Sequence, residues 1–362
     1  MAWKGFNTVA AFVDNENTWA SGTAKVAGTG HKVFITSESL VPNAQLIPSD
    51  SLTGSPFPAF GDKGDELHAG AVSVEYDFET IHRLLAFAMG TAGTPTEVES
   101  TVAWQHDLRF NDSLEGVYTT WVFGQSGLFV REYPLVKHNG FTLAVEHNQR
   151  VTGDFGLVPK TLNFNTTAGI NELTTLVDYT LPTNADTRYA TFNDLVIQIN
   201  AAGGAGLASP TDDMSFISSV SLDVPGAMLE DDVTVGNAPF VDEPLRNGDL
   251  QITGSLNATK LLDTDQLTEL LDKSLLKMKW IFTGSAVPGG TTTRSMTFYF
   301  SNVQIDTADI NVAGKELAPK NLTFRCAKPA AAHTGFSYAD ALFVEIVNTD
   351  AIDPLSNSWP AS

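Results

Sequence analysis

The sequence predicts a mainly β fold made of two tandem copies of one module, each a β-sandwich or barrel with one packed α-helix. Three observations lead to this prediction. Short runs of alternating apolar and polar residues recur along the chain, an eight-residue motif appears twice, and each half contains one strongly amphipathic segment. With 362 residues, of which 43% are hydrophobic, the chain is long enough to bury a sizeable core in each of two domains.

The strands are predicted from segments rich in aromatic and β-branched residues. Residues 118–123, 297–300 and 303–305 have this composition, and residues 341–347 form a last candidate near the end of the chain. Many such strands with only one strong helix in each half are typical of a sandwich or barrel with a helix packed on one side. They are not typical of a doubly wound sheet.

The duplication is predicted from segments that recur in the same order. The motif Leu-x-Pro-Lys-x-Leu-x-Phe occurs at 157–164 and at 317–324, with five of eight positions identical. Earlier in each half a glycine, Gly70 or Gly254, precedes an alternating run that leads toward the amphipathic segment. Because order and spacing agree as well as composition, we expect two like-folded halves.

The first helix is predicted over residues 78–89. Asp77 is placed to accept the free amide hydrogens of its first turn, and Gly90 stands where a left-handed C-cap is wanted. Its apolar face comprises Phe78, Ile81, Leu84, Leu85 and Ala88. The second helix is predicted over 264–276, where Asp263 and Gln266 have capping-box spacing.

These elements divide the chain into four predicted parts. They are a first module over 1–165, a connector over 166–212, a second module over 213–332, and a C-terminal strand with an extended tail over 333–362. Within the connector, residues 191–194 are expected to start a short helix that ends near Asn200. Residues 201–208, rich in glycine, are expected to form a flexible loop.

The composition limits the partners of the chain. It has 21 Lys and Arg against 42 Asp and Glu, a net charge of −21, which argues against tight binding to nucleic acid or to an anionic membrane. No stretch approaches the roughly 20 apolar residues that span a bilayer. Because the N-terminus lacks the apolar core of a signal peptide and Cys326 is the single cysteine, we expect a protein that is made in a cytoplasm and has no intrachain disulfide.

The motifs of catalysis and cofactor binding are missing, so we predict no catalytic, cofactor-binding or metal-binding residues and no cofactor. No two histidines have zinc-site spacing, and His82 is expected to be a surface residue. No Gly-x-Ser-x-Gly elbow occurs, and the glycines of 203–206 lack the lysine of a phosphate-binding loop. Cys326 is expected to be a small buried side chain.

The segment HAGAVSVEYDFETIHRLLAFAMGT, residues 68–91, and the two-module layout resemble the major tail tube proteins of siphophages. The resemblance implies a structural subunit of the virion tail, made in the host bacterial cytoplasm. Its relatives form stacked rings around a channel for DNA, and two-module chains can make a pseudo-hexameric ring from three copies. Sheet edges would form the ring contacts. Long loops such as 42–66 and the glycine-rich connector are candidates for contacts with the next ring. Expected partners are further copies and other tail proteins, namely the tape measure, tail terminator and distal tail proteins.

The acidity of the chain suits such a channel. Net charge is −8 over 1–165, −4 over 166–212 and −9 over 213–362, so both modules carry enough carboxylates to line an acidic lumen. DNA would then pass without specific binding, because phosphates meet no excess of cations. Two other functions stay open, a carbohydrate-binding or adhesive β-sandwich of a virion or cell surface, and an enzyme whose site is assembled only in the fold. The duplication favours the tube, since pseudo-symmetry helps to close a ring.

Overall fold

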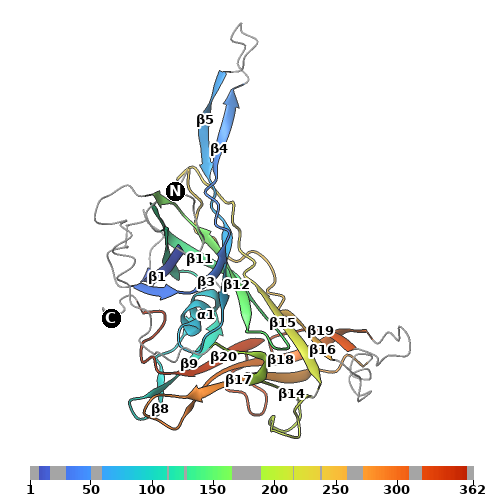
Figure 1. The fold of residues 1–362 in the computed structure, drawn as a ribbon. Helices are drawn as coiled ribbons and strands as arrows, with labels where there is room; N and C mark the ends of the chain where they lie inside the picture. The colour runs from blue at the N-terminus through green and yellow to red at the C-terminus, as the bar shows by residue number, and fades with distance from the viewer. Residues whose placement is uncertain are drawn as a thin grey trace.

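The structure is a computed structural model, and it confirms a mainly β fold (Figure 1). It describes residues 8–16, 30–49, 59–111, 114–125, 129–164, 189–214, 216–236, 239–258, 272–309 and 320–356. These residues form twenty strands, one α-helix and one 3₁₀-helix. No helix among them is both long enough and apolar enough to cross a membrane.

The elements of the first half run from β1 to β13. They are β1 (Thr8–Glu16), β2 (Gly30–Val33), β3 (Ile35–Glu38), β4 (Ala44–Ser49), β5 (Ala59–Glu66), β6 (Gly70–Glu75), α1 (Ile81–Met89), β7 (Gly90–Ala92), β8 (Thr96–Glu99), β9 (Ala103–Phe110), β10 (Tyr118–Gln125), β11 (Phe129–Glu146), β12 (Thr152–Pro159) and β13 (Asn163–Phe164).

The second half begins with a 3₁₀ turn. Its elements are η2 (Phe192–Asp194), β14 (Leu195–Ala201), β15 (Ile217–Pro225), β16 (Thr253–Ala258), β17 (Leu276–Ala286), β18 (Thr293–Asp309), β19 (Lys320–Arg325) and β20 (Leu342–Asn348).

One sheet of eight antiparallel strands runs through both halves of the chain. Its order is β3-β6-β12-β11-β15-β16-β19-β18. The halves meet where β11 pairs with β15, from Gly140 opposite Pro225 to Glu146 opposite Ser219. We call this the eight-strand sheet, and its edges are β3 and the C-terminal part of β18.

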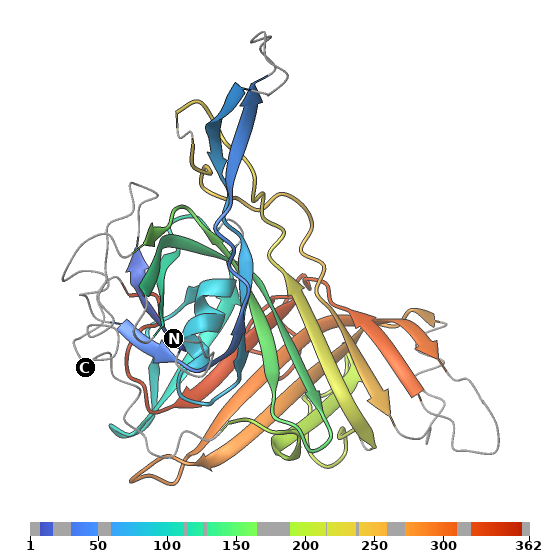
Figure 2. The same ribbon diagram turned by 45° about the horizontal axis from the view of Figure 1, so that its top comes forward.

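Two flanking sheets are joined to the eight-strand sheet by its two longest strands (Figure 2). The N-terminal part of β11 belongs to the first flanking sheet, β2-β1-β10-β11-β13. The N-terminal part of β18 belongs to the second, β14-β17-β18-β20-β9, to which β7 and β8 add. The predicted strand near the chain end is confirmed as β20, and it pairs with β9 of the first half.

Both halves follow the same pairing order, but the repeated motif does not mark matching positions. In each half four strands pair in the order β3-β6-β12-β11 or β15-β16-β19-β18, and the second strand has a glycine at or next to its start. However, Gly70 lies opposite Leu157, the first residue of the motif, whereas Gly254 lies opposite Phe324, its last residue. The duplication stays a prediction that rests on strand order and not on this sequence match.

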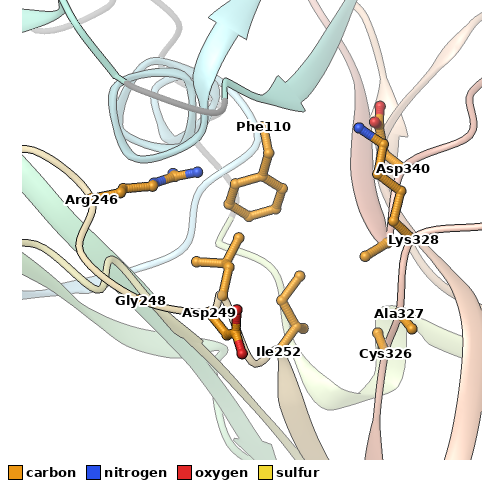
Figure 3. Close-up of a pocket in the computed structure, with 11 residues that line it drawn as sticks. Phe110, Arg246, Gly248, Asp249, Ile252, Cys326, Ala327, Lys328 and Asp340 are labelled. Atoms are coloured by element: carbon orange, nitrogen blue, oxygen red, sulfur yellow. The ribbon is translucent and has the colours of Figure 1, made fainter.

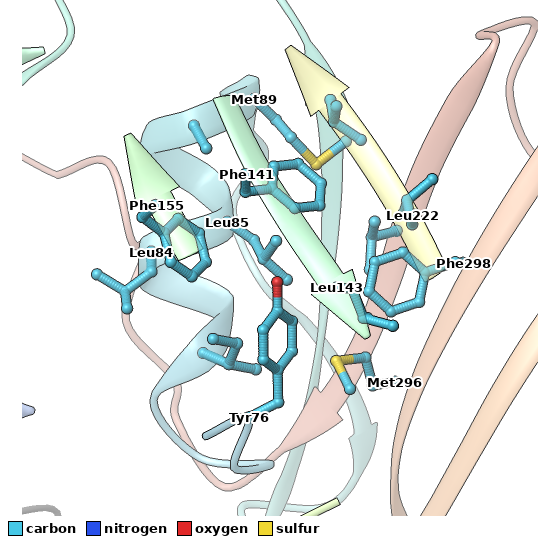
Figure 4. Packing of buried hydrophobic residues seen from close by; sticks show 14 of the residues in the cluster. Tyr76, Leu84, Leu85, Met89, Phe141, Leu143, Phe155, Leu222, Met296 and Phe298 are labelled. Carbon is cyan, nitrogen blue, oxygen red and sulfur yellow. The ribbon is translucent and has the colours of Figure 1, made fainter. Parts of the chain in front are cut away.

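Helix α1 lies in the core between the eight-strand sheet and the second flanking sheet (Figure 4). It begins three residues later than predicted, because the Asp77 carboxylate accepts the amide hydrogens of Glu79 (2.8 Å) and Thr80 (2.6 Å) in a turn that precedes the helix. The predicted left-handed cap at Gly90 is confirmed, with φ 87°. Leu84, Leu85 and Met89 pack with side chains of both sheets, among them Phe141, Phe155, Leu222, Met296 and Phe298.

The prediction that His82 lies on the surface is wrong. All nine residues of α1 are buried, because the segment after β20 covers the side of the helix that the sheets leave open. There His82 Nε2 lies 3.0 Å from a carboxylate oxygen of Asp350, and His82 Nδ1 accepts a hydrogen bond from Asn348 (3.0 Å). These partners let a polar ring stay buried.

The predicted second helix, 264–276, falls mostly outside the described residues, and its last residue, Leu276, begins β17. The predicted connector helix is also wrong beyond its first turn. Residues 192–194 form the 3₁₀ turn η2, which has a capping box between Thr191 and Asp194, but residues 195–201 are strand β14. The apolar residues of β14 alternate and it pairs with β17 along its whole length, so sheet pairing overrides the local helix signal.

The glycine-rich loop, 201–208, has a structural contact that its composition did not reveal. Lys277 is fully buried, and its ammonium group donates to the carbonyl oxygens of Gly204 (2.9 Å) and Thr334 (3.1 Å). The loop therefore supplies one of the acceptors that make this buried cation tolerable.

Candidate functional site

The face of the eight-strand sheet that points away from the core is the candidate functional surface, and we call it the polar face. Side chains of its strands alternate, so that residues such as Val74, Leu143 and Leu222 are buried while their neighbours are partly or fully exposed. On six of the eight strands the partly or fully exposed positions are Ala71, Ser73, Glu75, Thr142, Ala144, Glu146, Thr152, Asp154, Gly156, Ser219, Ser221, Asp223, Thr253, Ser255, Asn257, Asn321, Thr323 and Arg325. Small and polar residues dominate this set, which makes the face hydrophilic.

Hydrogen bonds between neighbouring strands hold these side chains against the sheet. Ser221 and Ser255 hydroxyls lie 2.7 Å apart, and the Asn257 amide donates to the Ser219 hydroxyl (2.8 Å). In the first half, Ser37 donates to Ser73 (2.9 Å). Such cross-strand pairs stabilise the sheet, and their polar groups point along the sheet toward the neighbouring strand.

The charges of the polar face are mostly negative. One row across the strands contains Asp154, Thr142, Asp223, Thr253 and Arg325, which are neighbours in register. Other carboxylates on the face are Glu75, Glu146 and Asp306. Arg325 is bound by Asp306 (2.7 Å and 2.8 Å from Nε to the two oxygens), and Arg150, at the end of the sheet, is bound by Glu75 (2.5 Å).

Two hollows lie beside this surface, and neither gathers groups for catalysis. A shallow hollow of about 380 Å³ on the polar face is lined by residues of β11, β15, β16, β18 and β19, among them Asp223 and Asp306. A second, of about 390 Å³, lies at the end of the sheet where β16 begins (Figure 3). There Arg246 donates to the Asn111 carbonyl (2.7 Å) and Asp340 accepts from Arg109 (2.6 Å), so these charged groups are engaged within the protein.

No cluster of three or more potential metal ligands occurs in the part of the chain that the structure describes. Cys326 follows β19 and is buried, as predicted, and burial raises the pKa of its thiol. This disfavours the thiolate that a nucleophile needs.

The eight-strand sheet thus has one face toward the core and one polar face. The chain belongs to the phage tail tube protein family, whose model, described as "Phage tail tube protein", matches residues 6–332. It is therefore a structural component of the virion tail, as the sequence resemblance implied. No curated protein matches the chain.

Sequence reasoning did not identify the residues of the polar face. The available signal was the alternation of small polar with branched apolar residues in segments such as 72–75, 219–224 and 253–258. What the alternation could not reveal is that these segments lie side by side in one sheet, because that depends on pairings between distant strands.

Proposed function

We propose that this protein forms the rings of a siphophage tail tube, and that the polar face of the eight-strand sheet lines the channel through which DNA leaves the capsid. The observation that carries the proposal is the face itself, which is continuous across both halves, rich in Ser and Thr, and acidic. DNA can slide past such a surface, because few protein cations are there to replace the counter-ions of its phosphates and so hold it in place.

The edges of the sheet provide a way to close a ring. Strand β3 pairs with β6 on one side only, and the C-terminal part of β18 pairs with β19 on one side only. No described strand of the chain occupies the outer edge of either. Unpaired strand edges attract further strands. We propose that β18 of one copy pairs with β3 of the next, as β11 pairs with β15 inside the chain.

The internal junction predicts the register of the contact between copies. Leu40 and Leu222 occupy equivalent positions in the two halves, because Leu40 lies beside Gly70 and Leu222 lies beside Gly254. Phe141 and Ala308 are equivalent in the same way. Each follows a bulge, and they pair with Phe155 and Leu322 of the closing strands.

Since Thr142 lies opposite Asp223 inside the chain, the same register would place Asp309 opposite Val41 of the next copy. Each half would then be one repeat unit, and three copies would close a pseudo-hexameric ring.

The β4–β5 hairpin is the proposed contact between rings. The described residues of the predicted loop 42–66 form this hairpin, whose strands pair with each other and which projects from the body (Figure 1). The last residue of β5, Glu66, also forms a single bridge with Phe240. Leu46 and Ile47 are exposed on it, by 69% and 57%. An isolated two-stranded hairpin is marginally stable in water, so packing on the next ring would stabilise it. The ends of the tube would meet the tape measure, tail terminator and distal tail proteins.

Electron microscopy of the purified protein tests this proposal. Hollow tubes or rings with threefold or pseudo-sixfold symmetry are expected. A density map should place Asp154 and Asp223 on the inner surface. A map in which the polar face lies outside, or between rings, would contradict the proposal.

A further inference from the structure

Two arginines lie on or beside the polar face in the described part of the chain, and each is bound by a carboxylate from a neighbouring strand. Arg325 on β19 meets Asp306 on β18 through Nε and Nη2, and Arg150 before β12 meets Glu75 on β6. The arginines are the exposed members of these pairs, at 57% and 52% of the side chain, against 28% and 26% for the carboxylates. Among the side chains described on this face, these are the cations within reach of a passing polyanion.

Stability alone does not account for these two pairs. Exposed ion pairs contribute little to folding, because water screens them and ordering the side chains costs entropy. Their effect on a polyanion is larger. An unpaired arginine is a preferred ligand of phosphate, which it binds through two parallel hydrogen bonds. A carboxylate that occupies the same donors removes both the charge and the geometry.

We infer that Asp306 and Glu75 mask Arg325 and Arg150, because each carboxylate occupies the donors of its arginine so that the arginine does not bind the phosphates of DNA. This inference rests on the proposed function, because it assumes that DNA passes along the polar face. It assigns roles that differ from those of the other acidic residues there. Asp223 and Glu146 add negative charge, whereas Asp306 and Glu75 also neutralise a particular cation.

The chain offers matched controls for this distinction. Asp306→Asn and Asp223→Asn each remove one negative charge from the same face, but only the first leaves an arginine without its carboxylate. In the same way, Glu75→Gln removes the carboxylate partner of Arg150, whose guanidinium still lies over the Tyr189 ring (4.5 Å). Glu146→Gln removes a carboxylate that pairs with no described arginine. A general effect of charge would be equal within each pair.

The test is the binding of a short fluorescent duplex DNA to the unassembled protein at low salt, measured by anisotropy. Asp306→Asn should raise the association constant about threefold or more above that of Asp223→Asn. Its dependence on salt should also steepen by about 0.9 in log–log slope, as expected for one added phosphate contact. Adding Arg325→Gln to Asp306→Asn should abolish the gain. Glu75→Gln should exceed Glu146→Gln in the same manner.

Equal binding by Asp306→Asn and Asp223→Asn would overturn the inference, as would binding that persists in the Asp306→Asn, Arg325→Gln variant. Thermal unfolding of the same variants checks that each is folded. Because the assay needs no tube, its outcome is separate from that of the microscopy. Tubes with an inward polar face but no difference between matched variants would support the proposed function and refute the masking role of Asp306 and Glu75.

Discussion

The carboxylate of Glu79, in the turn before α1, forms a buried ion pair with Nε of Arg294 on β18. The two side chains are 3% and 1% exposed, and they join the first half of the chain to the second. Glu79 also accepts hydrogen bonds from the backbone and hydroxyl groups of Thr349, and Arg294 donates to the carbonyl oxygen of Ala286 (2.9 Å). The pair therefore holds α1, β18 and the segment after β20 together.

Removing one member of this pair should be strongly destabilising. We expect Arg294→Met to lower the free energy of unfolding by about 3–5 kcal/mol, because the Glu79 carboxylate stays buried without its cation. Arg294→Met combined with Glu79→Leu should lose less than the sum of the single variants. Chemical denaturation measures both values. Additive losses would show that the two groups act independently.

Gly140 should be indispensable at the junction of the halves. It has φ +80°, and a Cβ there would lie 2.3 Å from the carbonyl oxygen of Val224 and 2.5 Å from the amide nitrogen of Gly226. Gly140→Ala is expected to destabilise the β11–β15 pairing and to lower the melting temperature by several degrees. Gly203→Ala is the matched control, because no atom lies within 4 Å of its added Cβ. An equal effect of the two substitutions would contradict this account of the junction.

Buried histidines should make the fold sensitive to acid. Burial lowers the pKa of His82 and of His138 to about 3, from 6.5. The folded state holds these rings neutral. Their full contribution to the free energy of unfolding is therefore present above pH 6.5. It is lost as the pH falls from 6.5 toward 3, by roughly 1.4 kcal/mol per pH unit for each ring.

His138→Phe isolates one of these contributions. His138 lies among aromatic rings, stacked on Phe87 with centroids 5.5 Å apart, so phenylalanine preserves the packing. The variant should show a shallower loss of stability between pH 6.5 and pH 3, by about one proton. Denaturant titrations at several pH values measure the slope. An unchanged slope would mean that His138 takes up its proton equally in the folded and unfolded states.

The hairpin should matter for stacking and not for folding. Leu46→Ser with Ile47→Ser removes exposed apolar surface from β4, where neither side chain contributes to the core. We expect an unchanged melting temperature and shorter or absent tubes, measured by calorimetry and electron microscopy. Val98→Ser, which alters an exposed apolar residue on β8, is the control and should assemble normally. Full-length tubes from the hairpin variant would argue against this contact.

The sequence was sufficient for features that depend on neighbouring residues. The strand runs, the first helix with its Gly90 cap, and the helical turn that starts at 191–194 all follow from local patterns. Where contacts between distant segments decide the outcome, local patterns were misleading. Residues 195–201 became a strand because β17 lies beside them, and His82 is buried because Asn348 and Asp350 return to cover α1.

The candidate surface shows the same limit. Alternation indicates that Ser221 and Asp223 face away from a core, but not that Thr253 and Thr142 lie on either side of Asp223. That arrangement comes from β11 crossing from the first flanking sheet into the eight-strand sheet. The length of β11 alone did not indicate the crossing.

Disulfide cross-linking between copies shows directly whether β18 of one copy pairs with the β3 edge of the next. Directly opposite residues on paired antiparallel strands have Cβ atoms about 4.5–5.5 Å apart, close to the span of a disulfide. Val41→Cys with Asp309→Cys, in a Cys326→Ala background, should therefore cross-link on oxidation of assembled tubes. We expect bands of one, two and three chains on a denaturing gel, with a final closed product of three chains and none from either single-cysteine variant. Tubes that assemble normally without this cross-link, or a ladder that continues beyond three chains, would contradict the account.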